Sequence, residues 1–135
     1  MKQRVSAVII SDNKILLIKR VKPDQEYYTL PGGTVEEGET IERAMYREFK
    51  EELSATPKIG KLLFETSSEG RKDYYFEIDE TLGVPKIGGP ELQRMNADNQ
   101  YILTWVEFED FKNLAGFYPN PPGTKEKLIA IWPHP

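Results

Sequence analysis

The spacing of apolar and polar positions in the first part of the chain predicts a series of short strands. Residues 5–10 are rich in β-branched side chains, and residues 15–18 repeat this character after a polar turn at residues 11–14. These segments predict a β-hairpin. A loop at residues 23–26 precedes residues 27–30, which predict another short strand that leads into glycines. The first quarter of the chain is therefore expected to be mostly β-structure.

A helix is expected next, beginning just after Thr40 and ending near Ser54. The Thr40 hydroxyl can accept a hydrogen bond from an early helical N–H, which makes this residue a suitable N-cap. Pro57 disfavours helical geometry at Thr56, so the helix is expected to stop before that residue.

The next part of the chain returns to strand-like patterns. Residues 61–66 and 73–78 predict two strands joined by a turn at residues 67–72, and residues 101–108 predict another strand. Residues 81–99 carry several glycines and prolines, which predict an irregular loop. A loop of this length in a small protein is often functional.

The C-terminal part predicts two helices. They are expected at residues 109–114 and 124–132, the second capped by Thr124, with a rigid turn at residues 116–123 between them. Strands, a helix, further strands and further helices together predict an α+β fold in which helices cover a mixed sheet. A length of 135 residues predicts one domain spanning residues 1–135.

Composition and charge narrow the class of protein. The formal net charge is −4, whereas a protein that holds long nucleic acid through its phosphates is usually basic. The chain has no cysteine, which excludes disulfides, zinc–thiolate sites and a thiol nucleophile and fits a reducing cytoplasm. The apolar run near the N-terminus is too short for a membrane span and lacks a signal-peptide pattern. We therefore expect a cytoplasmic protein that acts on small molecules.

The predicted central helix carries a patch of carboxylates. Glu48, Glu51 and Glu52 are related by i, i+3 and i+4, which places them on one helix face. Like charges at this spacing cost about 0.2–0.5 kcal/mol per pair, and a bound Mg²⁺ or Mn²⁺ would reverse that effect. The alternative is an ordinary solvated acidic surface. Gly32 and Gly33, just before the helix, can bring bare backbone close to a ligand or simply form a tight turn.

Residues 33–55 resemble the Nudix box of MutT-like hydrolases, which sets a glycine, an arginine and four glutamates at fixed spacings. The matching residues are Gly33, Glu39, Arg47, Glu48, Glu51 and Glu52. Three uncharged positions depart from the pattern, since Phe49 and Ala55 replace aliphatic residues and Ser54 replaces a glycine. These departures affect packing positions and leave every charged position intact.

The resemblance implies the Nudix fold, an α/β/α sandwich with a central mixed β-sheet. It also implies that Mg²⁺ or Mn²⁺ is held by Glu48, Glu51, Glu52 and the carbonyl of Gly32, with Gly33 beside the substrate. Glu48 or Glu52 would alternatively take the proton of the attacking water.

The resemblance implies a different task for the box arginine, Arg47, which orients the glutamates. Arg47 is expected to pair with Glu51 at i+4 or to reach back to Glu39, which has a structural role in the box. An ordinary helix ion pair would explain the same spacing.

Two residues outside the box complete the expected site. Arg20, at the end of a predicted strand, resembles a family arginine that meets a substrate phosphate, and the alternative is a solvated basic strand edge. Glu91, in the long irregular segment, would add a metal ligand or a base, and the alternative is a solvated loop glutamate.

The resemblance implies a hydrolase that cleaves a nucleoside diphosphate linked to another moiety, with a nucleoside triphosphate as the first candidate substrate. A non-catalytic nucleotide sensor is the alternative, although such proteins usually lose box glutamates. An isoprenoid diphosphate isomerase would need a catalytic cysteine, which this chain lacks. The expected partner is a small nucleotide derivative, and the chain is expected to be a monomer or a homodimer.

Overall fold

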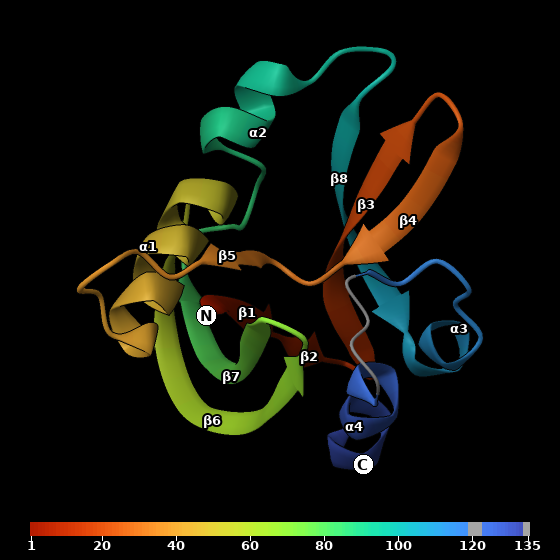
Figure 1. Cartoon of the computed structure of the whole chain (residues 1–135). Helices are drawn as coiled ribbons and strands as arrows, with labels where there is room; N and C mark the ends of the chain where they lie inside the picture. Colours follow the sequence, from red (N-terminus) through yellow and green to blue (C-terminus); the bar gives the residue numbers. More distant parts are fainter. Residues whose placement is uncertain (119–122, 134–135) are drawn as a thin grey trace.

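The computed structural model of the chain describes residues 1–118 and 123–133, and in this part eight strands form two four-stranded sheets (Figure 1). The strands are β1 (Lys2–Val8), β2 (Ile10–Ser11), β3 (Lys14–Lys22), β4 (Gln25–Thr29), β5 (Gly32–Thr34), β6 (Thr56–Ser68), β7 (Arg71–Leu82) and β8 (Gln100–Glu107). The helices are α1 (Ile41–Leu53), α2 (Gly89–Arg94), α3 (Phe108–Lys112) and α4 (Thr124–Ile131).

The two sheets differ in strand direction. The first has the order β5-β1-β7-β6, in which β1 and β7 are parallel and the other pairs antiparallel, so this sheet is mixed, as the sequence predicted. In the second, β3 lies between β4 and β8, pairs also with β2 and is antiparallel to all three.

The strands bury both faces, because helices lie on each side of them. On β3, Leu16 and Ile18 pack in one core with the buried face of α1, whereas Ile15 and Leu17 pack in a second core. The second core includes Phe111 of α3 and residues of α4, and Figure 1 shows these two helices away from α1. A strand that is covered on both sides has apolar residues at consecutive positions, as β3 has at residues 15–18. This layering confirms the predicted α/β/α sandwich.

Helix α1 begins and ends where the sequence predicted. The Thr40 hydroxyl accepts a hydrogen bond from the Arg43 backbone N–H at 3.2 Å. The helix ends at Ser54, which adopts a left-handed conformation with φ 53° and donates its N–H to the Lys50 carbonyl. Glycine adopts this conformation at lower cost, so Ser54 carries strain at a position where the Nudix box has glycine.

Several predicted boundaries were wrong. Strands β6 and β7 extend well beyond the predicted segments and leave only Glu69 and Gly70 as the turn between them. Residues 81–99 are not wholly irregular, because they contain the end of β7 and the short helix α2. The three-residue strand β5 was not predicted at all.

The structure corrects one prediction for the C-terminal part and leaves others outside the described residues. Gly123, not Thr124, is the residue before α4, and Thr124 is the first residue of that helix. Part of the predicted turn at residues 116–123 falls outside the described residues. His134, which the sequence makes a poor catalytic candidate, also falls outside them. Among the helices of the described chain, none has the length and apolar character needed to cross a membrane.

Candidate active site

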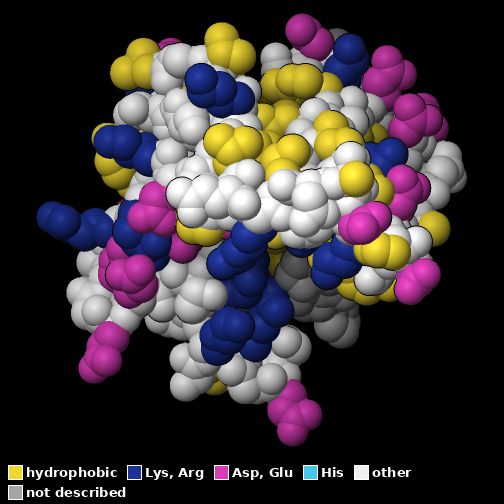
Figure 2. All heavy atoms as spheres, turned by 90° about the horizontal axis from the view of Figure 1, so that it is seen from above, with side chains coloured by type: hydrophobic (Ala, Val, Ile, Leu, Met, Phe, Trp, Pro, Cys, Tyr) yellow, Lys and Arg dark blue, Asp and Glu magenta, His cyan; other side chains and the backbone are white. Residues whose placement is uncertain are grey.

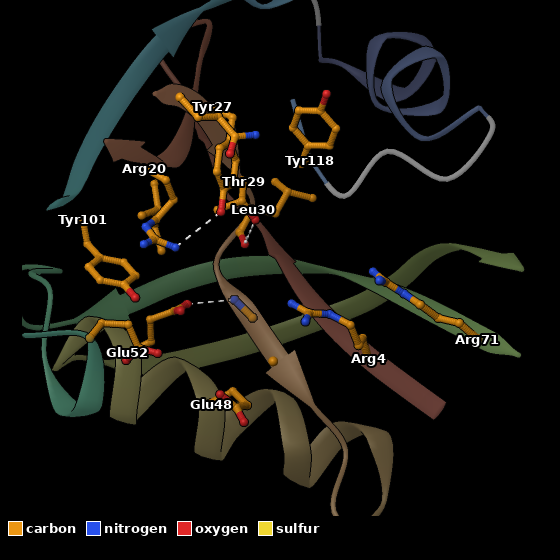
Figure 3. Close-up of a pocket in the computed structure, with 15 residues that line it drawn as sticks. Arg4, Arg20, Tyr27, Thr29, Leu30, Glu48, Glu52, Arg71, Tyr101 and Tyr118 are labelled. Carbon is orange, nitrogen blue, oxygen red and sulfur yellow. Dashed lines mark hydrogen bonds between the residues drawn. The ribbon is translucent and has the colours of Figure 1, made fainter. Parts of the chain in front are cut away.

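A cavity of about 570 Å³ opens where the two sheets and α1 meet (Figure 3). Strand β5 and the end of β4 line the cavity, and α1 contributes carboxylates below them in Figure 3. The lining side chains that bear charge are Arg4, Arg20, Arg71, Glu48, Glu52 and Glu91. Acidic and basic groups therefore converge on one cavity from β1, β3, β7, α1 and α2.

Two glycines let the backbone of β5 lie against the carboxylates. A methyl group on Gly33 would overlap the Glu48 carboxylate, and one on Gly32 would overlap the Val5 carbonyl. The Gly32 N–H donates a hydrogen bond of 2.8 Å to Glu52 Oε1. The backbone of β5 therefore lies against both β1 and α1, and a larger residue at Gly33 would separate β5 from α1.

Glu52 occupies the most unfavourable electrostatic position in the cavity. Burial raises its pKa to about 8, and the negative charges of Glu91 and Glu48 add to that shift. The Gly32 hydrogen bond and the charge of Arg4 oppose it and do not overcome it. A carboxylate in this position is favoured in its ionised form only when more positive charge arrives.

Glu48 lines the cavity and also contacts the Arg47 guanidinium. Burial raises the pKa of its carboxyl, while the Arg47 guanidinium opposes that rise through a hydrogen bond of 2.9 Å. Glu48 therefore has one neutralising partner, which Glu52 lacks.

Arg47 holds several carboxylates together outside the cavity. It donates two hydrogen bonds to Glu39, of 2.7 and 2.9 Å, one of 3.1 Å to the Thr34 carbonyl and a longer one of 3.4 Å to Glu51. We call Arg47 and the carboxylates that it contacts the Arg47 cluster; these are Glu36, Glu39, Glu48 and Glu51. Both partners that the sequence suggested for Arg47, Glu39 and Glu51, are thus present.

The ion pair between Arg47 and Glu39 shifts both pKa values in the expected directions. The Arg47 hydrogen bonds hold the Glu39 pKa at about 2. The pKa of Arg47 is raised above its already high value, chiefly by the same bonds. Both groups therefore stay charged at neutral pH, and their ion pair is maintained there.

Glu91 reaches the cavity because its segment is fixed to the end of α1. The Lys86 and Gly88 N–H groups donate to the carbonyls of Leu53 and Glu52, both at 2.8 Å. These bonds satisfy carbonyls that the end of the helix leaves free. Glu91 follows in the first turn of α2 and lines the cavity with Glu48 and Glu52. The alternative of a solvated loop glutamate remote from the site does not describe this arrangement.

Arg20 lies on β3 between the two strands that flank it. Its guanidinium carbon is 3.7 Å from the centroid of the Tyr101 ring, and Nη2 donates a hydrogen bond of 2.6 Å to Asn99 Oδ1. A weaker contact of 3.4 Å joins Nη1 to the Tyr27 hydroxyl. Arg20 is therefore a positioned cation in the cavity wall and not a freely solvated strand edge.

The predicted metal ligands are only partly brought together. Glu48, Glu52, Glu91 and Gly32 line the cavity, whereas Glu51 turns toward Arg47 and its side chain is 53% exposed. In residues 1–118 and 123–133, no three acidic or histidine side chains are arranged closely enough to hold a metal ion. For one ion to bind all the predicted carboxylates, the Glu51 side chain would have to turn toward the cavity.

The donor set nevertheless fits a hard divalent cation. Carboxylate and carbonyl oxygens are the ligands that Mg²⁺ and Mn²⁺ prefer. Burial raises the Glu52 pKa, and the charges of Glu91 and Glu48 add to that rise. A divalent cation beside these carboxylates would favour their ionised forms.

Sequence reasoning missed several lining residues. Arg4, Arg71, Tyr101 and Tyr118 join the cavity through strand pairing and chain reversal over long separations. No local pattern pointed to Arg71, because it lies in the predicted turn at residues 67–72. For Arg4, the available signal was a charged residue directly before a β-branched strand.

Basic side chains also gather on one face of the molecule. Figure 2 shows this face from above, with a group of Lys and Arg side chains beside a hydrophobic patch. The chain as a whole carries a net charge of −4. Positive charge is therefore concentrated locally, which suits recognition of a small anion.

Together, the fold and the glycine–carboxylate arrangement define the class of protein. A family model described as the NUDIX domain matches residues 1–127, and the chain belongs to the Nudix family. A protein of Methanocaldococcus jannaschii described as an ADP-ribose pyrophosphatase is 41% identical over 111 residues. The match covers 82% of this chain and 62% of that protein, so the chain matches less than two thirds of that relative.

Solved structures show the same fold. The solution structure of the E. coli ORF135 protein superposes with a TM-score of 0.73 at 25% identity, covering 97% of this chain and 90% of that one. The crystal structure of a MutT NUDIX hydrolase from Burkholderia pseudomallei gives a TM-score of 0.70 at 27% identity, covering 96% and 97%. The Nudix box identified in the sequence is thus supported by similarity along nearly the whole chain.

Proposed function

We propose that this protein hydrolyses a phosphoanhydride bond in a nucleoside diphosphate that is linked to another moiety. The observation that carries this proposal is the cavity in which Glu48, Glu52 and Glu91 converge beneath the bare backbone of Gly32 and Gly33. A diphosphate needs charge neutralisation and a positioned water, and little covalent chemistry falls to the protein.

Mg²⁺ or Mn²⁺ would be held by Glu48, Glu51, Glu52 and Glu91, with the Gly32 carbonyl as a further ligand. When bound, such an ion neutralises phosphate charge and lowers the pKa of water. Arg47 contributes by holding Glu48 at the cavity edge.

The chain's own groups divide the remaining work. Arg20, fixed by Asn99 and Tyr101, would donate hydrogen bonds to a substrate phosphate. Glu48, Glu52 or Glu91 would accept the proton of the attacking water. Among the described residues Glu91 makes no side-chain hydrogen bond, which leaves its oxygens available, whereas Glu52 Oε1 already accepts from Gly32.

Two substrate classes follow from different observations. The 41% identical relative is described as an ADP-ribose pyrophosphatase, which favours ADP-ribose. The chain also resembles a protein described as a MutT NUDIX hydrolase over 96% of its length. That similarity supports a nucleoside triphosphate, which would yield a monophosphate and pyrophosphate. Cytoplasmic location and a monomeric or homodimeric state remain predictions from the sequence.

The direct experiment measures phosphate and pyrophosphate release from a panel of nucleotides with Mg²⁺ or Mn²⁺. The panel holds canonical and oxidised nucleoside triphosphates, ADP-ribose, dinucleoside polyphosphates and sugar nucleotides. We expect turnover of at least one compound by the natural protein and its loss in Glu52→Gln. Nucleotide binding without turnover across the panel would contradict hydrolysis and favour the non-catalytic sensor.

A further inference from the structure

Arg4 is an arginine in the cavity wall without a partner. It lies on β1 and pairs in register with Asp73 of β7, yet among the described residues no carboxylate lies within ion-pair distance of it. Its Nε is buried and has no hydrogen-bond partner in the described part of the chain. A buried N–H without a partner is costly, so such a group in a cavity wall is suited to bind a ligand.

The neighbouring Arg71 explains why Arg4 is left unpaired. Arg71 donates two hydrogen bonds to Asp73, of 2.8 and 2.7 Å, and uses both carboxylate oxygens. Asp73 is only 1% exposed. The two arginines share one aspartate, so the positive charge of Arg4 has no ion pair among the described residues at this side of the cavity.

This charge lies away from the other cation of the cavity. Figure 3 shows Arg4 and Arg71 at one side and Arg20 with Tyr101 at the other, above Glu48 and Glu52. If the carboxylates and Arg20 hold the diphosphate of a substrate, Arg4 is available to bind the next group of that substrate.

We propose that Arg4, supported by Arg71, forms a second anion-binding subsite that receives a phosphate group of the substrate beyond the cleaved diphosphate bond. This inference rests on the proposed function. A phosphate matches both observations, because it accepts the hydrogen bond from Arg4 Nε and neutralises the positive charge of Arg4. A neutral carbonyl, such as the edge of a nucleobase, would satisfy only the hydrogen bond.

The subsite separates the two candidate substrate classes. A nucleoside triphosphate carries a third phosphate that can reach Arg4. ADP-ribose ends in a neutral ribose and would leave Arg4 unused. Arg4 is therefore assigned to substrate specificity and not to bond cleavage.

The first test compares kcat/KM for ATP and ADP-ribose in the natural protein, Arg4→Gln, Arg4→Lys and Arg43→Gln. Arg43 is an exposed arginine on α1 that does not line the cavity, so it controls for the loss of one positive charge. We expect Arg4→Gln to lower kcat/KM for ATP about tenfold or more and to leave ADP-ribose within about threefold. Arg4→Lys should restore most of the loss, and Arg43→Gln should change neither substrate. Equal losses on both substrates, a loss on ADP-ribose alone or no loss would overturn the subsite.

The second test needs no turnover and separates the two proposals. Calorimetry measures the affinity of the same four proteins for inorganic tripolyphosphate and pyrophosphate with Mg²⁺. The natural protein should bind tripolyphosphate about tenfold more tightly than pyrophosphate, and Arg4→Gln should remove that preference. If the preference depends on Arg4 while the nucleotide panel is silent, the subsite stands and the hydrolase proposal fails. If nucleotides are hydrolysed and no such preference exists, the subsite fails and the hydrolase stands.

Discussion

Two groups of carboxylates around α1 have opposite electrostatic environments. In the Arg47 cluster, one guanidinium binds several carboxylates, and the pKa of Glu39 falls to about 2. In the cavity, Glu52 receives one backbone hydrogen bond and faces Glu48 and Glu91, and its pKa rises to about 8. Arg47, at the centre of the first environment, and Glu52, in the second, both lie on α1.

The difference separates carboxylates that the protein pairs with a cation from one that it buries without such a pair. Arg47 forms ion pairs with the carboxylates of its cluster, so the protein itself fixes these side chains in place. In the cavity, Glu52 has no ion-pair partner among the described residues, and burial raises its pKa. Glu48 belongs to both groups, because it accepts a hydrogen bond from Arg47 and lines the cavity.

Glu52→Gln should have the largest effect on activity. Removing the charge of this cavity carboxylate should lower kcat by about 1,000-fold, because the cation and the developing charge both depend on it. The fold should survive, since the amide can still accept the Gly32 N–H bond. Steady-state kinetics and circular dichroism check these outcomes, with the exposed Glu37→Gln as control. Undiminished turnover in Glu52→Gln would remove Glu52 from the site.

Arg47→Lys should have the next largest effect. A lysine cannot bind Glu39, Glu48 and the Thr34 carbonyl at once, because it lacks the planar fork of arginine. We expect kcat/KM to fall about 10- to 100-fold, with a lower melting temperature, since groups that orient metal ligands have effects of this size. Arg43→Lys on the same helix is the matched control. A loss of stability with full activity would reduce the cluster to a purely structural role.

Mg²⁺ should raise the melting temperature of the natural protein. A ligand that binds only the folded state adds about 2.7 kcal/mol at 100 times its Kd. Differential scanning calorimetry with millimolar MgCl₂, and with NaCl at equal ionic strength, measures the shift. Glu52→Gln should show a much smaller shift, whereas Glu39→Gln should retain it. Equal shifts in both variants would place the cation outside the cavity.

Glu52 and Glu39 should change the unfolding free energy in opposite directions as pH rises. Folding raises the Glu52 pKa from 4.5 to about 8, so its protonated form favours the folded state. Its contribution to stability is fully present below about pH 4.5 and is lost as pH rises toward 8. The Glu39 pKa is lowered to about 2, so its contribution is present above about pH 4.5 and is lost as pH falls toward 2.

Denaturant unfolding without metal tests these slopes. Glu52→Gln should flatten the decline in unfolding free energy between pH 5 and 8, the interval set by the Glu52 shift. Glu39→Gln should leave that decline unchanged and weaken the acid-side dependence. The opposite assignment of slopes would show that another group controls stability above pH 5.

Much of the site could be predicted because its central residues are local in sequence. The spacing of Glu48, Glu51 and Glu52 and the cap at Thr40 depend on helix geometry alone, and the structure places them on α1 as expected. The predicted hairpin of residues 5–10 with residues 15–18 was wrong, because β1 pairs with β5 and β7 and only the short β2 pairs with β3.

Prediction failed where structure depends on distant partners. Strand β5 is two glycines and a threonine, which have no hydrophobic pattern, and it exists because it pairs with β1. Strand β6 contains Pro57 and Gly60, which weaken any local strand signal, yet it lies at a sheet edge where proline is tolerated. The pairing register of β1 and β7 brings Arg4 and Arg71 to the same cavity, although they are far apart in sequence.

The attachment of residues 86–88 to the end of α1 has a consequence for how such a protein can diverge. Glu91 takes its position from backbone bonds to Leu53 and Glu52, and not from the length of chain that precedes it. Leu82 and Val84, just before this anchor, are 71% and 84% exposed. Insertions there would leave Glu91 in place, because the backbone bonds that position it lie after the insertion point.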